Sequence, residues 1–280
     1  MKIKRLPFLI IGIILLLTFL TMAIFPQFFT SYNQKYSFEP WLPPSFSHIL
    51  GTNSLGYDIF AELIYGARQT ILISLTASLG SLIIGVIIGI LASFDSIIGT
   101  FFNGIINIFV LLPKLLILIV FVSFLNNNNL TLIILISCFT WVSTARSIKA
   151  KLINLKKQQF IEVNRHYGFP KIHNICIHIL PNLKDIIMTR LLLGITTCIM
   201  MESTLSFLGF GNLYYPTWGV MINFARNRGA LVHQAYGYLI APCLCIAFLS
   251  LSFYFISIYF EAKQTIIDKD WLWIKKKKFG

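Results

Sequence analysis

The chain has 280 residues, of which 56% are hydrophobic and only 12% are charged, and its formal net charge is +13. Soluble domains carry about 25% charged residues, so this chain has too few to cover a surface that faces water. A soluble globular fold is therefore excluded, and the composition predicts a protein whose helices face lipid. The excess of Lys and Arg over Asp and Glu is compatible with nucleic-acid binding or with the cytoplasmic loops of a membrane protein.

Six apolar runs predict an all-α polytopic membrane protein with about six transmembrane helices, since about 17–25 apolar residues cross a bilayer. In chain order the runs are 6–25, 70–94, 97–125, 130–144, 183–205 and 236–260. The third contains Pro113, which predicts a kink. The first could also be a cleaved signal peptide, but no small-residue cleavage site follows it, so a retained helix is favoured.

The positive charges decide the orientation. If Met1 is cytoplasmic and the spans alternate, 17 of the 23 Lys and Arg residues lie on or beside cytoplasmic segments, four lie outside and two lie within spans. Such a bias predicts that both termini are cytoplasmic. It also accounts for the net charge without nucleic acid. Four lysines at 275–278, close to Trp271 and Trp273, are typical of a tail at an anionic membrane surface.

Three regions follow from these runs. Residues 1–69 form a first transmembrane helix and a proline-containing outer linker, and residues 70–265 form a core of five transmembrane helices. The core includes a strongly basic cytoplasmic loop at 145–182, and residues 266–280 form a basic cytoplasmic tail.

The cytoplasmic loop predicts two short helices. Residues 158–167 lack Gly and Pro, and Gly168 followed by Pro170 ends that helix. Apolar residues at 172, 175, 176 and 179 then define an amphipathic helix. The pair could lie on the membrane surface or bind a soluble partner. Metal binding by His173, Cys176 and His178 is disfavoured, because their spacing fits no standard ligand set.

Three segments carry a resemblance to a known family. Residues 162–168 (EVNRHYG) and 177–182 (IHILPN) resemble the signature loop of ABC importer permeases. Residues 48–58 (HILGTNSLGYD) with 63–68 (LIYGAR) resemble the outer segment of the dipeptide/oligopeptide/nickel permease subfamily. Residues 202–211 (ESTLSFLGFG) with 216–219 (PTWG) resemble its loop after the fifth span, and the order and spacing of all three blocks agree with the subfamily.

The resemblance implies a permease subunit of a bacterial cytoplasmic (inner) membrane importer, in which this multi-pass chain forms half of the translocation pathway. It implies a second homologous permease subunit, two ABC ATPase subunits that bind ATP and Mg, and an extracytoplasmic substrate-binding protein. This chain itself would bind no cofactor and no metal. Loop 158–180 would dock in an ATPase, while cargo would arrive near 26–69 and 206–235. Peptide uptake is the favoured function, with nickel or metal-chelate uptake as the alternative.

The resemblance also implies three sets of functional residues. The ATPase-coupling set comprises Glu162, Val163, Asn164, Arg165, Gly168, Pro170, His178, Pro181 and Asn182. The outer-face set comprises Gly51, Thr52, Gly56, Asp58 and Arg68. The set after the fifth span comprises Glu202, Ser206, Phe207, Leu208, Gly209, Gly211, Trp218 and Gly219. Glu202 is expected to have a structural hydrogen-bonding role. Asn53 and Tyr57 depart from the subfamily, which usually has Asp and Arg there.

Other function classes find less support in the sequence. An ion-coupled transporter or a channel acting alone would need paired carboxylates in mid-span, and the spans contain no such pair. A membrane enzyme would need a catalytic constellation, and Ser203 and Ser206 lack the G-x-S-x-G spacing of a hydrolase. No G-x-x-x-x-G-K-[ST] run occurs, so the ATPase is expected on another chain.

Overall fold

The computed structural model describes residues 6–33, 36–125, 128–156 and 183–279, with side chains as far as Glu261. Within these ranges the chain is helical and has no β-strand, apart from two isolated bridges in the loop before α2. The α-helices are α1 (Leu6–Ile24), α2 (Ile59–Leu91), α3 (Ile97–Leu111), α4 (Lys114–Ser123), α5 (Asn129–Thr140), α6 (Val142–Lys156), α9 (Lys184–Leu205), α10 (Trp218–Asn227) and α11 (Tyr236–Phe279). A 3-10 turn, η2 (Pro26–Phe28), and a π-helical turn, η5 (Ser206–Phe210), complete the described elements.

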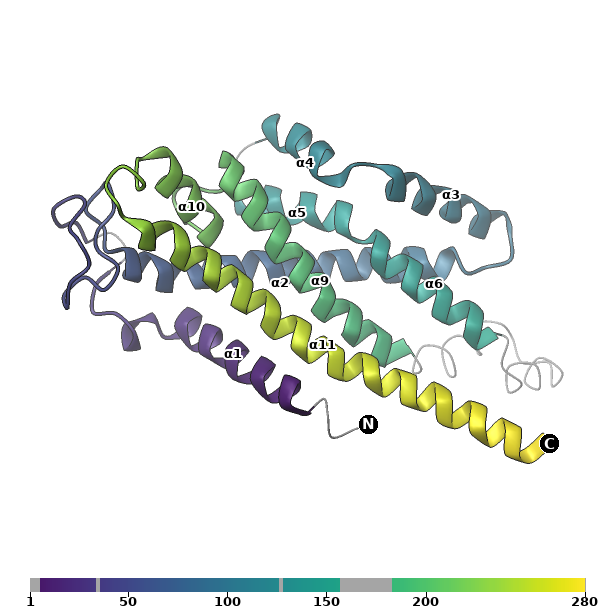
Figure 1. Ribbon diagram of the computed structural model, residues 1–280. Coiled ribbons are helices and arrows are strands. Elements are labelled where there is room, and N and C mark those ends of the chain that lie inside the picture. The colour runs from purple at the N-terminus through teal and green to yellow at the C-terminus, as the bar shows by residue number, and fades with distance from the viewer. Residues whose placement is uncertain (1–5, 34–35, 126–127, 157–182, 280) are drawn as a thin grey trace.

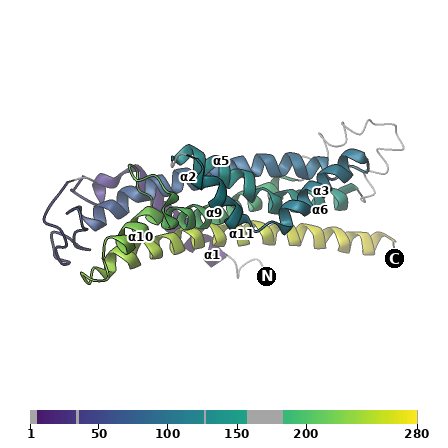
Figure 2. The ribbon, with the colours of Figure 1, turned by 90° about the horizontal axis from the view of Figure 1, so that it is seen from above.

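The helices form one elongated bundle, with α2 in its interior between α1, α5, α6 and α9 (Figure 1). Five helical segments are long and apolar enough to cross a membrane, and the bent pair α3–α4 makes up to six. The expected class of polytopic all-α protein is thereby confirmed. We call the end that carries the loop 25–58 and α10 the outer end, following the predicted orientation (Figure 2). The opposite end, where α6 ends and α9 begins, is the cytoplasmic end.

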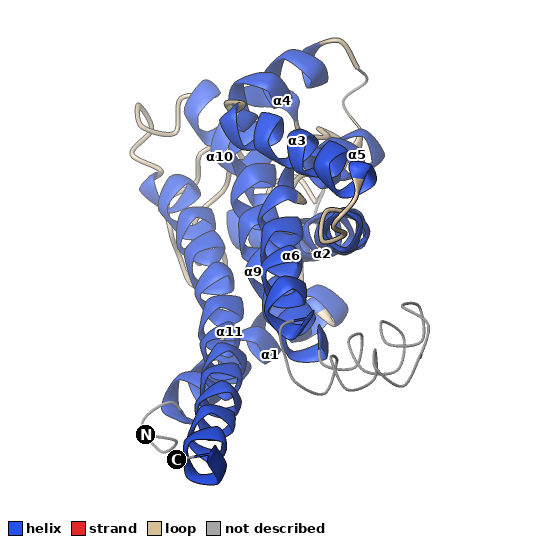
Figure 3. Cartoon of the chain, turned by 90° about the vertical axis from the view of Figure 1, so that its right-hand side faces the viewer, coloured by secondary structure: helices blue, strands red, loops and turns tan. Residues whose placement is uncertain are grey.

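Close helix crossings depend on small residues, as is usual in membranes. Along α2, a Cβ atom added to Gly85 would lie 2.7 Å from Cβ of Thr144, and one added to Gly89 would lie 2.8 Å from the carbonyl oxygen of Ala145. Gly12 of α1 meets α11 in the same way, at 2.9 Å from the carbonyl oxygen of Ser252. The first apolar run is therefore an integral helix of this bundle, lying alongside α11 (Figure 3).

Several predicted boundaries differ from the structure. The second span begins at Ile59 rather than Thr70, because Asp58 caps α2 by accepting a 2.8 Å hydrogen bond from the amide of Ala61. The fourth extends through α6 to Lys156, so the first part of the predicted cytoplasmic loop is helix whose Ile148 and Leu152 are buried. The sixth continues as a helix to Phe279, through the predicted tail.

The third predicted span is broken. α3 and α4 are bent by 86° at Leu112–Pro113, which confirms the predicted kink at Pro113. Proline lacks the amide hydrogen that would continue the ladder, and its ring clashes with the preceding turn. The pair lies along one side of the bundle, next to α5 and α6 (Figure 1).

Candidate functional site

The outer-face motif is a compact loop that leads into α2. Gly51 and Gly56 have φ values of +79° and +76°. A Cβ atom would lie 2.4 Å from the carbonyl oxygen of Leu42 at Gly51, and 2.1 Å from that of Phe38 at Gly56. Both the backbone conformation and the available space therefore require glycine.

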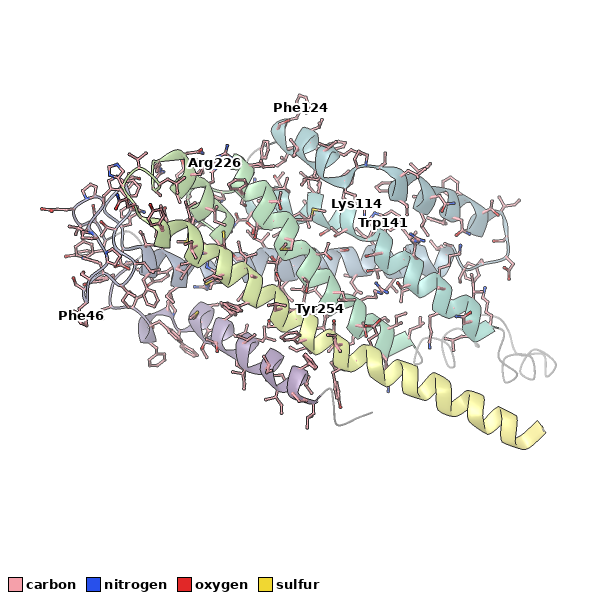
Figure 4. All side chains as sticks on the ribbon, viewed as in Figure 1. Phe46, Lys114, Phe124, Trp141, Arg226 and Tyr254 are labelled. Atoms are coloured by element: carbon pink, nitrogen blue, oxygen red, sulfur yellow. The ribbon has the colours of Figure 1, made fainter. Side chains whose placement is uncertain are left out.

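Two polar side chains of this motif hold the loop together. The Thr52 hydroxyl donates to the carbonyl oxygen of Glu39 at 2.7 Å and accepts from the amide of Leu42 at 2.8 Å. Asp58, besides capping α2, contacts Nδ1 of His48 at 2.8 Å, and both side chains are buried. The predicted Thr52 and Asp58 thus join segments ten or more residues apart in the loop. Phe46 marks the exposed tip of this loop (Figure 4).

Asn53, one of the positions that depart from the subfamily, joins the loop to α2. Its Oδ1 accepts from the amides of Leu55 at 2.8 Å and Tyr57 at 3.0 Å, and its Nδ2 donates to Oε2 of Glu62 at 2.8 Å. Glu62 is buried and contacts Tyr238 of α11 as well. Glu62 was not predicted as a site residue, since the apolar runs placed it in an outer linker. An acidic residue four positions after the capping Asp58 was the available signal for a helix start.

Glu202 is the centre of the motif after the fifth span. Its side chain is fully buried near the end of α9, and its Oε1 accepts hydrogen bonds from the hydroxyls of Ser206 at 2.7 Å and Thr217 at 2.6 Å. The hydroxyl of Ser203 lies 3.4 Å from Oε2. A buried carboxyl group needs such partners. These contacts are those of a structural hydrogen-bonding residue.

Glycines let α9 turn back toward α10. Gly209 has a φ of +100° within η5, and a Cβ atom on Gly211 would lie 2.3 Å from Cγ2 of Val220. Gly219 permits a close approach of α10 to α9, since its Cβ would lie 2.8 Å from the carbonyl oxygen of Ser203. Thr217, which also caps α10 through the amide of Val220 at 3.4 Å, was quoted in the motif but not predicted as a site residue.

Within the π-helical turn η5, Phe207 contacts α10, whereas Leu208 faces outward. The carbonyl oxygen of Phe207 accepts from Nδ2 of Asn223 at 2.7 Å, and the guanidinium carbon of Arg226 lies 5.3 Å from the Phe207 ring centroid. Leu208 is 43% exposed and so faces the surroundings of the bundle. Arg226 lies on α10 at the outer end of the bundle (Figure 4).

Trp218 brings the two outer motifs together. Its Nε1 donates to the carbonyl oxygen of Leu63 at 2.8 Å, and its amide donates to Oγ1 of Thr70 at 3.1 Å. Its ring covers Gly66, whose added Cβ would lie 3.1 Å from Cδ1, and meets the ring of Phe19 edge-on at 5.5 Å between centroids. α10 is thus fixed to α2 and α1. Among the predicted outer residues, Arg68 is exposed and lies outside this cluster.

The nine predicted ATPase-coupling residues fall within 157–182, outside the described residues. Within the described ranges, no group of three or more His, Cys, Asp or Glu residues is placed to hold a metal ion. The described site is a network of buried hydrogen bonds that joins the outer loop, α2, α9 and α10. Together with the long apolar helices, it defines a polytopic helical membrane protein with a structured outer end.

Comparison with known proteins gives the family. Residues 81–266 match the family described as binding-protein-dependent transport system inner membrane component. The chain is 28% identical to the dipeptide transport system permease protein DppC of Bacillus subtilis (strain 168), over 95% of this chain and 83% of that protein. It is 32% identical to the oligopeptide transport system permease protein OppC of the same organism, over 75% of this chain and 70% of that protein.

A third relative is DppC of Alkalihalophilus pseudofirmus (strain ATCC BAA-2126 / JCM 17055 / OF4), which is 30% identical over 81% of this chain and 76% of that protein. The chain therefore belongs to the family of inner membrane components of binding-protein-dependent transport systems. It is a permease subunit of an ABC importer, as its resemblance in sequence implied.

Proposed function

We propose that this permease takes up peptides across a bacterial cytoplasmic membrane. The observation that carries the proposal is that several relatives, matched over most of their length, are named as dipeptide or oligopeptide permeases. The alternative cargo, nickel or a metal chelate, has no comparable support among these relatives. Selectivity would rest largely on a separate substrate-binding protein.

The active importer would contain a second, homologous permease and two ATPase subunits, which would hold ATP and Mg. This chain would bind no cofactor or metal of its own. The basic segment 145–182 supports a cytoplasmic position for the coupling region. Loop 158–180, with Glu162 to Gly168 at its centre, would dock in an ATPase and receive its movement.

The substrate-binding protein would meet the outer end, where loop 25–58, α10 and the start of α11 lie together (Figure 2). Trp41 of this loop stacks on His233 at 4.5 Å between ring centroids, which ties the loop to the connection between α10 and α11. Because Trp218 and Glu202 fix α10 to α2 and α9, the outer end would move with these helices rather than separately. ATP-driven closure of the two ATPase subunits at the cytoplasmic end would then open the path between the two permeases alternately to each side of the membrane.

Uptake measurements test the substrate. Cells lacking this permease would be supplied with the wild-type chain or an empty vector, and given radiolabelled dialanine or radiolabelled nickel in separate assays. The wild-type chain should restore dialanine uptake and leave nickel uptake unchanged. Restoration of nickel uptake alone would overturn the peptide proposal.

Assembly and orientation are tested separately. Purification of the tagged chain should recover two ATPase subunits for each pair of permeases, and recovery of none would contradict the proposed assembly. A reporter placed after Gly280 should be cytoplasmic, whereas one inserted at 126–129 should be extracytoplasmic. The opposite result would reverse the predicted topology.

A further inference from the structure

The cytoplasmic end of α2 is held by two neighbouring helices. The last carbonyl groups of an α-helix lack partners within the helix, so side chains commonly satisfy them. Nδ2 of Asn103, on α3, donates to the carbonyl oxygen of Ala92 at 3.1 Å. Nζ of Lys156, on α6, donates to the carbonyl oxygen of Ser93 and lies 5.4 Å from the centroid of the Phe94 ring.

Lys156 occupies a particular place in the chain. It is the last residue of α6 and stands two positions before the proposed coupling loop 158–180. Leu152 and Leu155 of the same turn are buried in a cluster that includes Val86 and Ile90 of α2. The side chain therefore extends from a packed helix end to the end of α2. A cation in this position also interacts favourably with the partial negative charge at a helix C-terminus.

We infer that Lys156 is a positioning residue that links the C-terminus of α6, next to loop 158–180, to the end of α2. This inference rests on the proposed function, in which the loop receives movement from an ATPase. A displacement of the loop would pull on α6, and the contact of Lys156 with Ser93 and Phe94 would carry that displacement to α2. At its other end, α2 holds α10 through the bond from Trp218 to Leu63.

The matched control is Lys149, which lies on the same face of α6 two turns earlier. Seven residues of helix correspond to about 10 Å, so its ammonium cannot replace Lys156 at Ser93. Lys149→Met removes the same charge from the same helix without removing the link. Lys156→Arg keeps a cation and a donor at the link, whereas Lys156→Met removes both.

The experiment uses the assembled importer in liposomes with its partner permease, ATPases and binding protein. The measured quantity is ATP hydrolysed per radiolabelled dialanine imported. Lys156→Met should raise this ratio about twofold or more, the usual size of the effect of a substitution along a coupling network. Lys156→Arg and Lys149→Met should remain near the wild-type ratio. A Lys156→Met ratio equal to that of Lys149→Met would overturn the inference.

A second readout does not depend on the cargo. Hydrogen exchange of the α10 amides would be compared with and without ATP and vanadate, and Lys156→Met should lose the wild-type change. If the wild-type importer shows this change in exchange but imports no dialanine, the peptide proposal fails. The role of Lys156 is then still tested by comparing α10 exchange in the wild type and in Lys156→Met. Should Lys156→Met not assemble, Phe94→Leu replaces it, with an expected rise in the ATP ratio of about twofold. An unchanged ratio there would overturn the inference.

Discussion

The indole Nε1 of Trp218 donates a 2.8 Å hydrogen bond to the carbonyl oxygen of Leu63, which lies 155 residues earlier in the chain. The side chain of Trp218 is fully buried, and its amide makes a second bond to Thr70 on α2. One residue thus connects the motif after the fifth span with the outer-face motif. It fixes the start of α10 against α2 at the outer end of this permease.

Trp218→Phe should lower the free energy of unfolding by about 2 kcal/mol, because it removes one hydrogen bond and part of a packed ring. Thermal melting of the purified protein, followed by circular dichroism, measures the effect. Tyr214→Phe is the control, since Tyr214 is 78% exposed and should tolerate the change. Equal melting temperatures for both variants would contradict the assigned role of Trp218.

Glu202→Ala should destabilise the protein by about 3 kcal/mol or more, since the hydroxyls of Ser206 and Thr217 lose their buried acceptor. Glu39→Ala provides the control, because the Glu39 side chain is exposed. In a double-mutant cycle, Ser206→Ala should add little to Glu202→Ala. Additive effects would mean that the two side chains do not act together.

Asn53→Asp should destabilise the outer loop by about 1–3 kcal/mol, because it replaces the donor to Oε2 of Glu62 by a second carboxyl group at the same distance. Adding Tyr57→Arg should recover much of the loss by supplying a nearby cation. Protease resistance of the loop and the melting temperature are the measurements. Asn212→Asp is the control, since Asn212 accepts a bond from the Tyr214 amide and a carboxylate can do the same. A double variant no more stable than Asn53→Asp would contradict this pairing.

Gly85→Ala should destabilise the bundle, because the new methyl group would lie 2.7 Å from Thr144 and 2.8 Å from the carbonyl oxygen of Trp141. We expect a loss of about 1–3 kcal/mol, the usual effect of overpacking. Gly104→Ala makes the same change within α3 where nothing lies within 4 Å, and should be neutral or stabilise by up to about 1 kcal/mol. The stability of both variants is measured by thermal melting in detergent. A loss of stability in Gly104→Ala as large as that in Gly85→Ala would argue against this packing.

The sequence by itself determined the membrane class, the approximate spans, the predicted orientation and the family resemblance. These properties depend on local composition and short motifs, since the bilayer requires apolar runs of a certain length and the positive-inside rule counts loop charges. The kink at Pro113 is equally local. Glycines at 51, 56 and 209 were identified as motif residues, and the structure gives each a positive φ.

Tertiary structure decided which of these residues meet. Hydropathy placed Glu62 in a linker, because a polar residue ends an apolar run whether or not the helix continues. Only the fold pairs Glu62 with Asn53, brings Trp218 to Leu63 and carries Lys156 to the end of α2. Such contacts join segments far apart in the sequence, and their partners are fixed by how the helices cross. No local pattern contains that information, so the network of the outer end became visible only in three dimensions.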